Sequence, residues 1–312
     1  MPGALLLAAL CADACSGGSS ASIPDGGDAG DPVGAFSVLL NEALDGTPAY
    51  VLIVGNVHSG PTPLAVQLTV SDTAGSCQLS KPVAYACGSG CGGTAVCVAD
   101  GVCQNSPTLE DVGAVTVSGV AKAMGDKTVM LTSVNGNYSP TADEEPAYPP
   151  FSEGDDVEVD ATGGKYAAFS IRAKAIAPLV LPADTVTVQR NQPVSLKWTA
   201  AGAAATSKIH VKLEISHHGG LKGQIDCDTT DTGALDISGS LVTELVDLGY
   251  SGYPSITVSR SAIGSTTIAL GRVDLRVGED IIRDVQIPGL VSCTADADCP
   301  TGQTCQTDLQ CK

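Results

Sequence analysis

Paired carboxylates are the first chemistry that this sequence could support. The tetrad Asp-Thr-Gly-Ala at residues 231–234 matches the loop from which two carboxylates that share one proton activate water for peptide hydrolysis. Such a site needs two loops of this kind or a symmetric dimer, and the sequence contains no second Asp-Thr-Gly or Asp-Ser-Gly. We therefore predict a hairpin turn between Cys227 and Ile237, and no catalytic residue of a recognisable type.

Two acidic clusters could instead bind calcium, which takes roughly six to eight oxygen ligands from such loops. One cluster consists of Asp155, Asp156, Glu158 and Asp160, and the other of Asp226, Asp228 and Asp231. Neither has the spacing of an EF-hand loop, so solvated strand faces and turns are the alternative, and only the second cluster is retained as a calcium candidate. Closely spaced zinc ligands are absent, and the neighbouring His217 and His218 would point to opposite faces of a strand. We predict no other metal and no cofactor.

Cysteine spacing carries the clearest structural signal. The chain has twelve cysteines, and ten remain when Cys11 and Cys15 are set aside, an even number that indicates up to five disulfides in an exported protein. Two sets of four have nearly the same spacing: Cys87, Cys91, Cys97 and Cys103, and then Cys293, Cys299, Cys305 and Cys311. We predict two copies of one small module, each bonded within itself, with three connectivities left open.

Cys77 and Cys227 remain once each set of four is bonded internally. If every cysteine pairs, one member of the first cluster must reach Cys227, and Cys77 is preferred because the other four mirror the C-terminal set. Such a bond would join the two halves of the chain and stabilise by about 4 to 5 kcal/mol in the chain-entropy model. The alternatives are two free buried thiols, or a bond from Cys77 to Cys87 with the other partners rearranged.

Residues 1–15 have the character of an export leader, with a short apolar run followed by small residues. No Lys or Arg precedes the run, which indicates an atypical leader or a start further upstream. Cys15, followed by Ser-Gly-Gly, resembles the lipid-modified cysteine of bacterial lipoproteins, and Cys11 is the alternative, although Asp13 departs from that motif. Residues 16–35 are predicted to be a disordered spacer. We expect an exported protein in the outer membrane or at the cell surface if lipidated, and otherwise a periplasmic or extracellular one.

The composition favours thin sheets and excludes nucleic acid as a partner. Hydrophobic residues make up 43% of the 312-residue chain, whereas aromatic residues make up only 4%. The formal net charge is −18, so the overall field repels nucleic acid and anionic lipid headgroups. A membrane tether would therefore depend on the lipidated cysteine.

Short β-prone runs separated by Gly, Asn, Asp and Pro turns continue from residue 36 to residue 287. The last four runs are 255–260, 266–270, 273–277 and 281–287. A proline-containing connector near residue 178 divides the series. We predict a mainly β fold of two immunoglobulin-like β-sandwich domains, at 36–178 with a disulfide-stapled insertion over 77–103, and at 179–290, followed by a disulfide-stapled tail at 291–312. One short helix is expected at 240–248, ending before Gly249.

Several motifs together resemble a known group of proteins. They are Ser76-Cys77-Gln-Leu, Pro193-Val-Ser-Leu-Lys-Trp198, Gly223-Gln-Ile-Asp-Cys227 and the cysteine-rich tail. Over most of the chain beyond residue 36 they look like uncharacterised exported, cysteine-containing, β-rich proteins and lipoproteins of myxobacteria and their relatives. The tail, with Asp298-Cys-Pro, is also similar to a Dickkopf-type cysteine module. The resemblance implies export and implies no activity.

These observations favour a non-catalytic protein of the cell envelope, exported or lipid-anchored, which acts as a binding or structural module. A protein or a glycan is the expected partner, since exposed loops on β-sandwiches are natural binding sites. The alternative is a secreted hydrolase whose pair of carboxylates is scattered in the sequence and therefore not recognisable from it.

Overall fold

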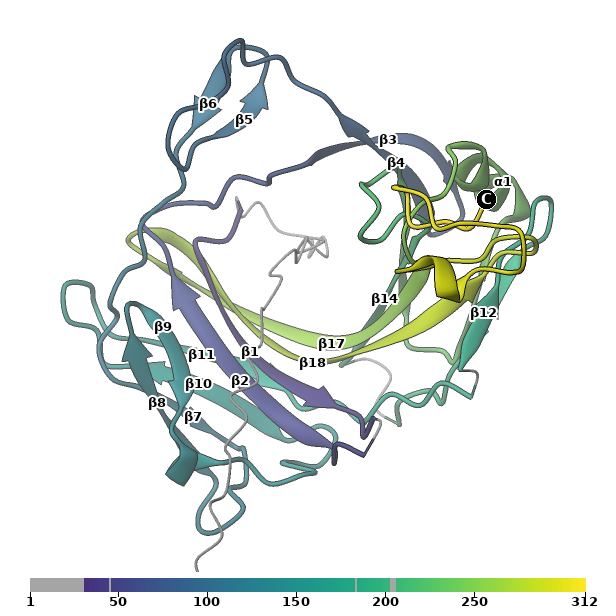
Figure 1. Ribbon diagram of the computed structural model, residues 1–312. Coiled ribbons are helices and arrows are strands. Elements are labelled where there is room, and N and C mark those ends of the chain that lie inside the picture. The colour runs from purple at the N-terminus through teal and green to yellow at the C-terminus, as the bar shows by residue number, and fades with distance from the viewer. Residues whose placement is uncertain (1–30, 45, 183, 203–205) are drawn as a thin grey trace, which may run out of the picture.

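The structure, a computed structural model, describes residues 31–44, 46–182, 184–202 and 206–312, and it is mainly β (Figure 1). The strands are β1 (Gly34–Asn41), β2 (Tyr50–Val57), β3 (Gln67–Ala74), β4 (Cys77–Val83), β5 (Val96–Ala99), β6 (Val102–Gln104), β7 (Val115–Ser118), β8 (Thr128–Val134), β9 (Asn137–Pro140), β10 (Asp156–Ala161), β11 (Phe169–Lys174), β12 (Thr185–Thr187), β13 (Val194–Lys197), β14 (Lys208–Glu214), β15 (Gln224–Thr230), β16 (Ala234–Ile237), β17 (Ser255–Ile268) and β18 (Gly271–Gln286). The helices are α1 (Gly239–Asp247) and two 3-10 turns, Ala142–Glu144 and Asp296–Asp298. The predicted mainly β class with a disulfide-stapled tail is confirmed.

One sheet of 14 strands runs through both halves of the chain, where the sequence predicts two separate immunoglobulin-like sandwiches. Its order is β11-β10-β7-β8-β9-β2-β1-β18-β17-β14-β15-β4-β3, with β12 beside β18. The hairpin of β17 and β18, with strands of 14 and 16 residues, lies at the centre of this order and spans the molecule (Figure 1). The first part of β18 pairs in parallel with β1, and its end pairs in parallel with β12.

This long hairpin replaces the four short strands expected between residues 255 and 287. Gly264 and Gly278 interrupt the β-prone runs and so suggest turns, but both lie inside strands. At Gly264 a glycine is required because a Cβ there would lie 1.7 Å from the carbonyl oxygen of Arg172 on β11. The edge strand β11 therefore lies directly against β17 and helps to enclose the core of the first half.

Two hydrophobic cores share the hairpin. The first contains buried residues such as Phe36, Ile53, Val117, Tyr138, Ile171 and Val277, and the second contains Leu79, Trp198, Leu213, Ile225, Leu241, Val258 and Ile281. Along β18 the change from one core to the other falls between Val277 and Ile281. The predicted boundary near residue 178 separates the cores along much of the sequence, but the hairpin belongs to both.

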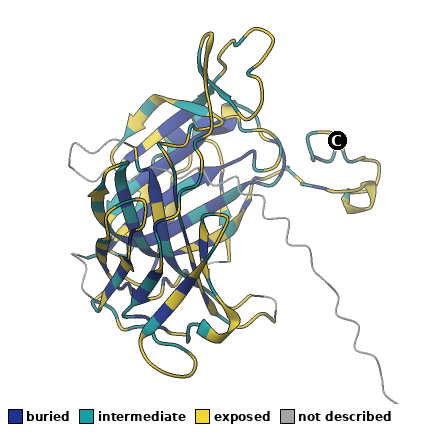
Figure 2. Cartoon of the chain, turned by 90° about the vertical axis from the view of Figure 1, so that its left-hand side faces the viewer, coloured by how far each residue is buried: buried dark blue, intermediate teal, exposed yellow. Residues whose placement is uncertain are grey.

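The hairpin of β3 and β4 crosses from the first half of the sequence into the second core. Strand β4 pairs with β15, so that Leu79 is buried in that core. The cysteine-rich excursion with β5 and β6 follows β4 and projects away from the sheets (Figure 1). Burial is concentrated in the strands of the body, whereas residues 87–106 of this excursion are exposed or half-buried (Figure 2).

The α-helix α1 lies within one residue of the predicted helix. The Ser238 side chain caps it by accepting a hydrogen bond from the backbone N–H of Leu241 at 3.3 Å, and Gly249 leaves it with a φ of +84°. Its buried face, including Leu241 and Leu245, packs into the second core. None of the described helices has the length and apolar character needed to cross a membrane.

Candidate binding site

The ten described cysteines form five disulfides. Cys77 and Cys227 are directly opposite each other on β4 and β15, with their Cα atoms 4.0 Å apart, and they are bonded. In both small modules the first cysteine bonds to the third and the second to the fourth, as Cys87–Cys97 with Cys91–Cys103, and Cys293–Cys305 with Cys299–Cys311. The shared connectivity is what two copies of one module would show. Five disulfides indicate an oxidising, non-cytoplasmic compartment. The predicted lipidation sites Cys15 and Cys11 lie outside the described residues.

The C-terminal module is fixed to the loop that contains Gly252. The Gln310 side chain and the Ser292 hydroxyl both donate to the carbonyl oxygen of Gly252 at 2.7 Å. The backbone N–H of Gly252 donates to the carbonyl oxygen of Asp308 at 2.8 Å. Because Gln310 is only 1% exposed, its hydrogen bond to Gly252 is shielded from solvent and fixes the tail to the second half.

The three calcium candidates do not converge on one point. Asp226 and Asp228 flank His210, whereas Asp231 is buried beside Arg260. Within the part of the chain that the structure describes, the groups of three or more ligand-type side chains whose atoms lie close together are Cys87, Cys91 and Cys97, and Cys293, Cys299 and Cys311. All six cysteines are in disulfides, so these groups serve crosslinking.

His210 on β14 lies between two carboxylates of the neighbouring strand β15. Its Nδ1 is 2.9 Å from an oxygen of Asp228, and its Nε2 is 3.4 Å from an oxygen of Asp226. Gln224 donates to the second oxygen of Asp226 at 2.7 Å. Burial disfavours the charged ring, but the hydrogen bonds that the ring donates to the two carboxylates, together with their negative charge, outweigh burial and raise the pKa of His210 to about 9. At neutral pH the ring is therefore a cation held between two carboxylates, rather than a general base.

This ion pair predicts a pH dependence of stability. The folded pKa of His210 lies above the ordinary value of 6.5, so its contribution is fully present below pH 6.5 and is lost as the pH rises through about 9. We expect the loss to be at most about 3 kcal/mol of unfolding free energy. Urea denaturation of the wild type and of His210→Gln at pH 6.5 and near pH 9 measures it. The variant should be less stable than the wild type at pH 6.5, and its unfolding free energy should change little between the two pH values. An equal change of unfolding free energy in the two proteins would contradict the assignment.

Asp231 does not form the predicted hairpin turn, because β16 pairs with β13 rather than with β15. Its carboxylate is fully buried and accepts hydrogen bonds from Arg260 Nε at 2.7 Å, Trp198 Nε1 at 2.7 Å and the Ser207 hydroxyl at 2.9 Å. Burial favours the neutral acid, but these donors outweigh it and hold the pKa of Asp231 below its usual value. Arg260 also donates to the carbonyl oxygens of Ala177, Pro178 and Thr199. The pair therefore anchors the connector between the two halves.

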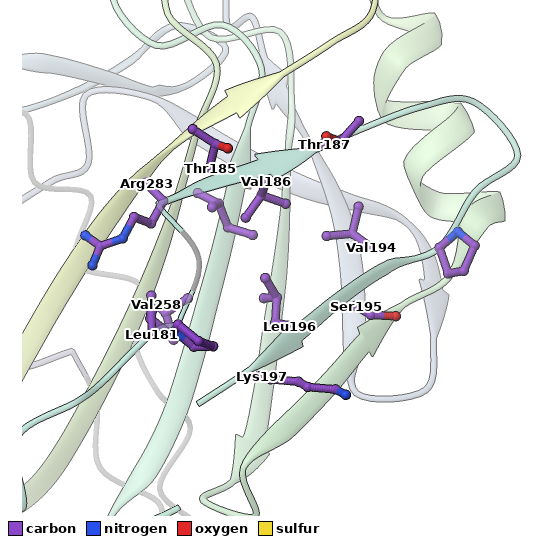
Figure 3. A pocket seen from close by; sticks show the side chains of 13 residues that line it. Leu181, Thr185, Val186, Thr187, Val194, Ser195, Leu196, Lys197, Val258 and Arg283 are labelled. Atoms are coloured by element: carbon purple, nitrogen blue, oxygen red, sulfur yellow. The ribbon is translucent and has the colours of Figure 1, made fainter. Parts of the chain in front are cut away.

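A pocket of about 300 Å³ lies between β12 and β13 (Figure 3). It is lined by Leu181, Pro182, Thr185, Val186, Thr187, Pro193, Val194, Ser195, Leu196, Lys197, Ile256, Val258 and Arg283. The lining combines apolar side chains with hydroxyl groups and two cations, and it contains no carboxylate. Arg283 is already paired with Glu42 through two hydrogen bonds of 2.6 and 3.1 Å. An apolar pocket with a few polar groups at its rim is the usual character of a binding site.

No protein-family model matches this chain, and the search of curated proteins found no match. The pocket and the buried charged groups are therefore the features of this chain that bear on its function.

Sequence reasoning missed both ion-pair networks and the pocket. The alternation of polar and apolar residues over 210–216 predicts a strand with one solvent-exposed face that includes His210, yet His210 is only 9% exposed. A signal was available, because Asp226 and Asp228 alternate on another strand and offer negative charges to the histidine. For Arg260, a single arginine in a β-prone run, the sequence offers no such signal. For the pocket, the local sequence signal is limited to Pro182 and Pro193, which precede β12 and β13.

Proposed function

We propose that the protein is a non-catalytic module of the cell envelope, exported and held at the membrane by a lipid on Cys15, or on Cys11, and that it binds a protein or glycan partner. The observation that carries the proposal is the pocket between β12 and β13, whose lining is apolar and cationic and contains no carboxylate. Two buried ionic networks, around His210 and Asp231, support it because their charged side chains contact one another within the fold.

The anchor is tested by expressing the full chain in a bacterial host and measuring its partition between detergent and aqueous phases. The wild type should enter the detergent phase, and Cys15→Ser should move it to the aqueous phase. Cys11→Ser is the matched control and should leave the partition unchanged. Lipid anchoring is wrong if the wild type stays in the aqueous phase. It is also wrong if the wild type enters the detergent phase and neither substitution changes that.

Binding is separated from hydrolysis by incubating the purified, oxidised protein with washed cell envelopes. We expect the protein to sediment with the envelopes while the supernatant gains neither reducing sugar ends nor free peptide amines. Release of such fragments by the wild type, abolished in Asp226→Asn, would instead establish the hydrolase alternative.

A further inference from the structure

Strands β12 and β13 are consecutive arms that belong to two different sheets, and a backbone hydrogen bond closes each end of the opening between them. At the turn, the N–H of Gln192 donates to the carbonyl oxygen of Gln189 at 3.2 Å. At the base, the N–H of Thr199 donates to the carbonyl oxygen of Val180, also at 3.2 Å. Between these bonds β12 pairs with β18 and β13 pairs with β16, and no backbone bond joins β12 to β13 in the described residues. The pocket occupies this opening (Figure 3).

The register shows which backbone groups of β12 face the opening. In a parallel ladder alternate residues direct both their N–H and C=O groups to the same neighbour. Val188 donates to the carbonyl oxygen of Gln286, so Val186, two residues earlier, also faces β18. The backbone groups of Thr185 and Thr187 must then point away from β18, toward β13.

In the antiparallel ladder of β13 and β16, alternate residues likewise direct both backbone groups to one neighbour. Trp198 donates to the carbonyl oxygen of Gly233, so Leu196 and Val194 share its orientation and bond with β16. The backbone groups of Ser195 and Lys197 therefore face β12. The bond from Thr199 to Val180 agrees with this parity, because Thr199 has the orientation of Ser195 and Lys197. Within the described part of the chain, these backbone donors and acceptors of the two strand edges have no backbone partner, and the edges flank the pocket.

The side chains of the pocket define what would lie between these edges. Val194 and Leu196 from β13, and Ile256 and Val258 from β17, are buried side chains that form the apolar floor of the pocket. Lys197 supplies an exposed cation on the rim, in a chain whose net charge is −18. Apolar side chains at alternate positions, together with a carboxylate at one end, would complement this surface.

We propose that the opening between β12 and β13 binds an extended segment of a partner protein, which adds as a strand to both edges. This inference rests on the proposed binding function and names the partner as a polypeptide. The two edges are three and four residues long, so the bonded part of the segment has a similar length. Because the arms are joined at both ends, the segment enters from the outer surface and does not thread through. Main-chain hydrogen bonds supply the affinity, and alternate side chains supply the specificity.

The probes are two capped synthetic peptides, Asp-Val-Thr-Val-Thr-Val-Asp and Asp-Val-Pro-Val-Pro-Val-Asp. Both carry the same charges and apolar residues, but the second lacks two backbone donors and resists pairing. Titration calorimetry with the intact, oxidised protein should detect the first peptide and not the second. Equal affinity for the two peptides, or no binding of the first at roughly millimolar concentration, overturns the inference.

Matched variants at one position test the backbone contact. Ser195→Pro removes a donor that faces the opening and leaves the bonds to β16 in place, whereas Ser195→Ala keeps the donor. Binding of the first peptide should be unchanged in Ser195→Ala and weakened about tenfold or more in Ser195→Pro. Equal unfolding midpoints of the two variants exclude misfolding as the cause of weaker binding. If Ser195→Pro is destabilised, the comparison of the two peptides with the wild-type protein becomes the test of the backbone contact. If the protein binds envelopes but does not distinguish the two peptides, this inference alone is wrong. If the protein releases fragments from envelopes, the proposed function alone is wrong.

Discussion

Replacing Asp231 with alanine should lower the free energy of unfolding by about 3 to 5 kcal/mol, because it leaves the Arg260 guanidinium buried without its carboxylate. Arg260 is 1% exposed and Asp231 is fully buried, so water cannot replace the lost partner. Trp198, the only tryptophan of the chain, donates to Asp231 and reports the transition by its fluorescence during urea unfolding.

Two further variants make this result specific. Asp247→Ala removes the carboxylate of an exposed ion pair with Arg190, and it should cost less than about 1 kcal/mol. The double variant Asp231→Leu with Arg260→Met should be more stable than Asp231→Ala, because it removes both buried charges together. A change below about 1 kcal/mol for Asp231→Ala would mean that the buried pair does not hold the connector in place.

Removing the Cys77–Cys227 disulfide should have a comparable effect. The two cysteines are 150 residues apart, and a loop of that size corresponds to about 5 kcal/mol in the chain-entropy model. Cys77→Ala combined with Cys227→Ala should therefore unfold at a much lower urea concentration while remaining folded through the β4 and β15 ladder.

The matched control is the pair Cys87→Ala and Cys97→Ala. Their disulfide spans only 10 residues and belongs to an excursion that contributes no residue to either hydrophobic core. Unfolding of the body, followed by Trp198 fluorescence, should be nearly unchanged. If both double variants shift the midpoint equally, the long-range crosslink is not what stabilises the body.

The sequence predicts local structure well where side-chain chemistry acts locally. Residues 50–57 alternate in burial as a strand should, and α1 follows from its leucines and from Gly249. The Cys77–Cys227 pair could be favoured from parity alone because every other cysteine had a local counterpart. Each of these inferences needs only neighbouring residues or a count.

What could not be predicted depends on contacts between segments far apart in the chain. Gly264 suggests a turn, and only the backbone of Arg172 beside it explains a glycine inside a strand. Asp231 resembles a catalytic acid until its neighbour Arg260, from another strand, is known. The pocket exists because β12 pairs with β18 and β13 pairs with β16, instead of with each other. The local pattern of residues does not predict which distant strand a strand pairs with.

The position of β1 has a mechanical consequence. The strand lies in the interior of the sheet, with seven registered partners along β18 on one side and eight along β2 on the other. A pull on the chain ahead of Gly34, such as a tether would transmit, loads both ladders lengthwise, so their hydrogen bonds resist together rather than opening one at a time. Because β18 also contributes to both cores, the load passes directly into the whole body.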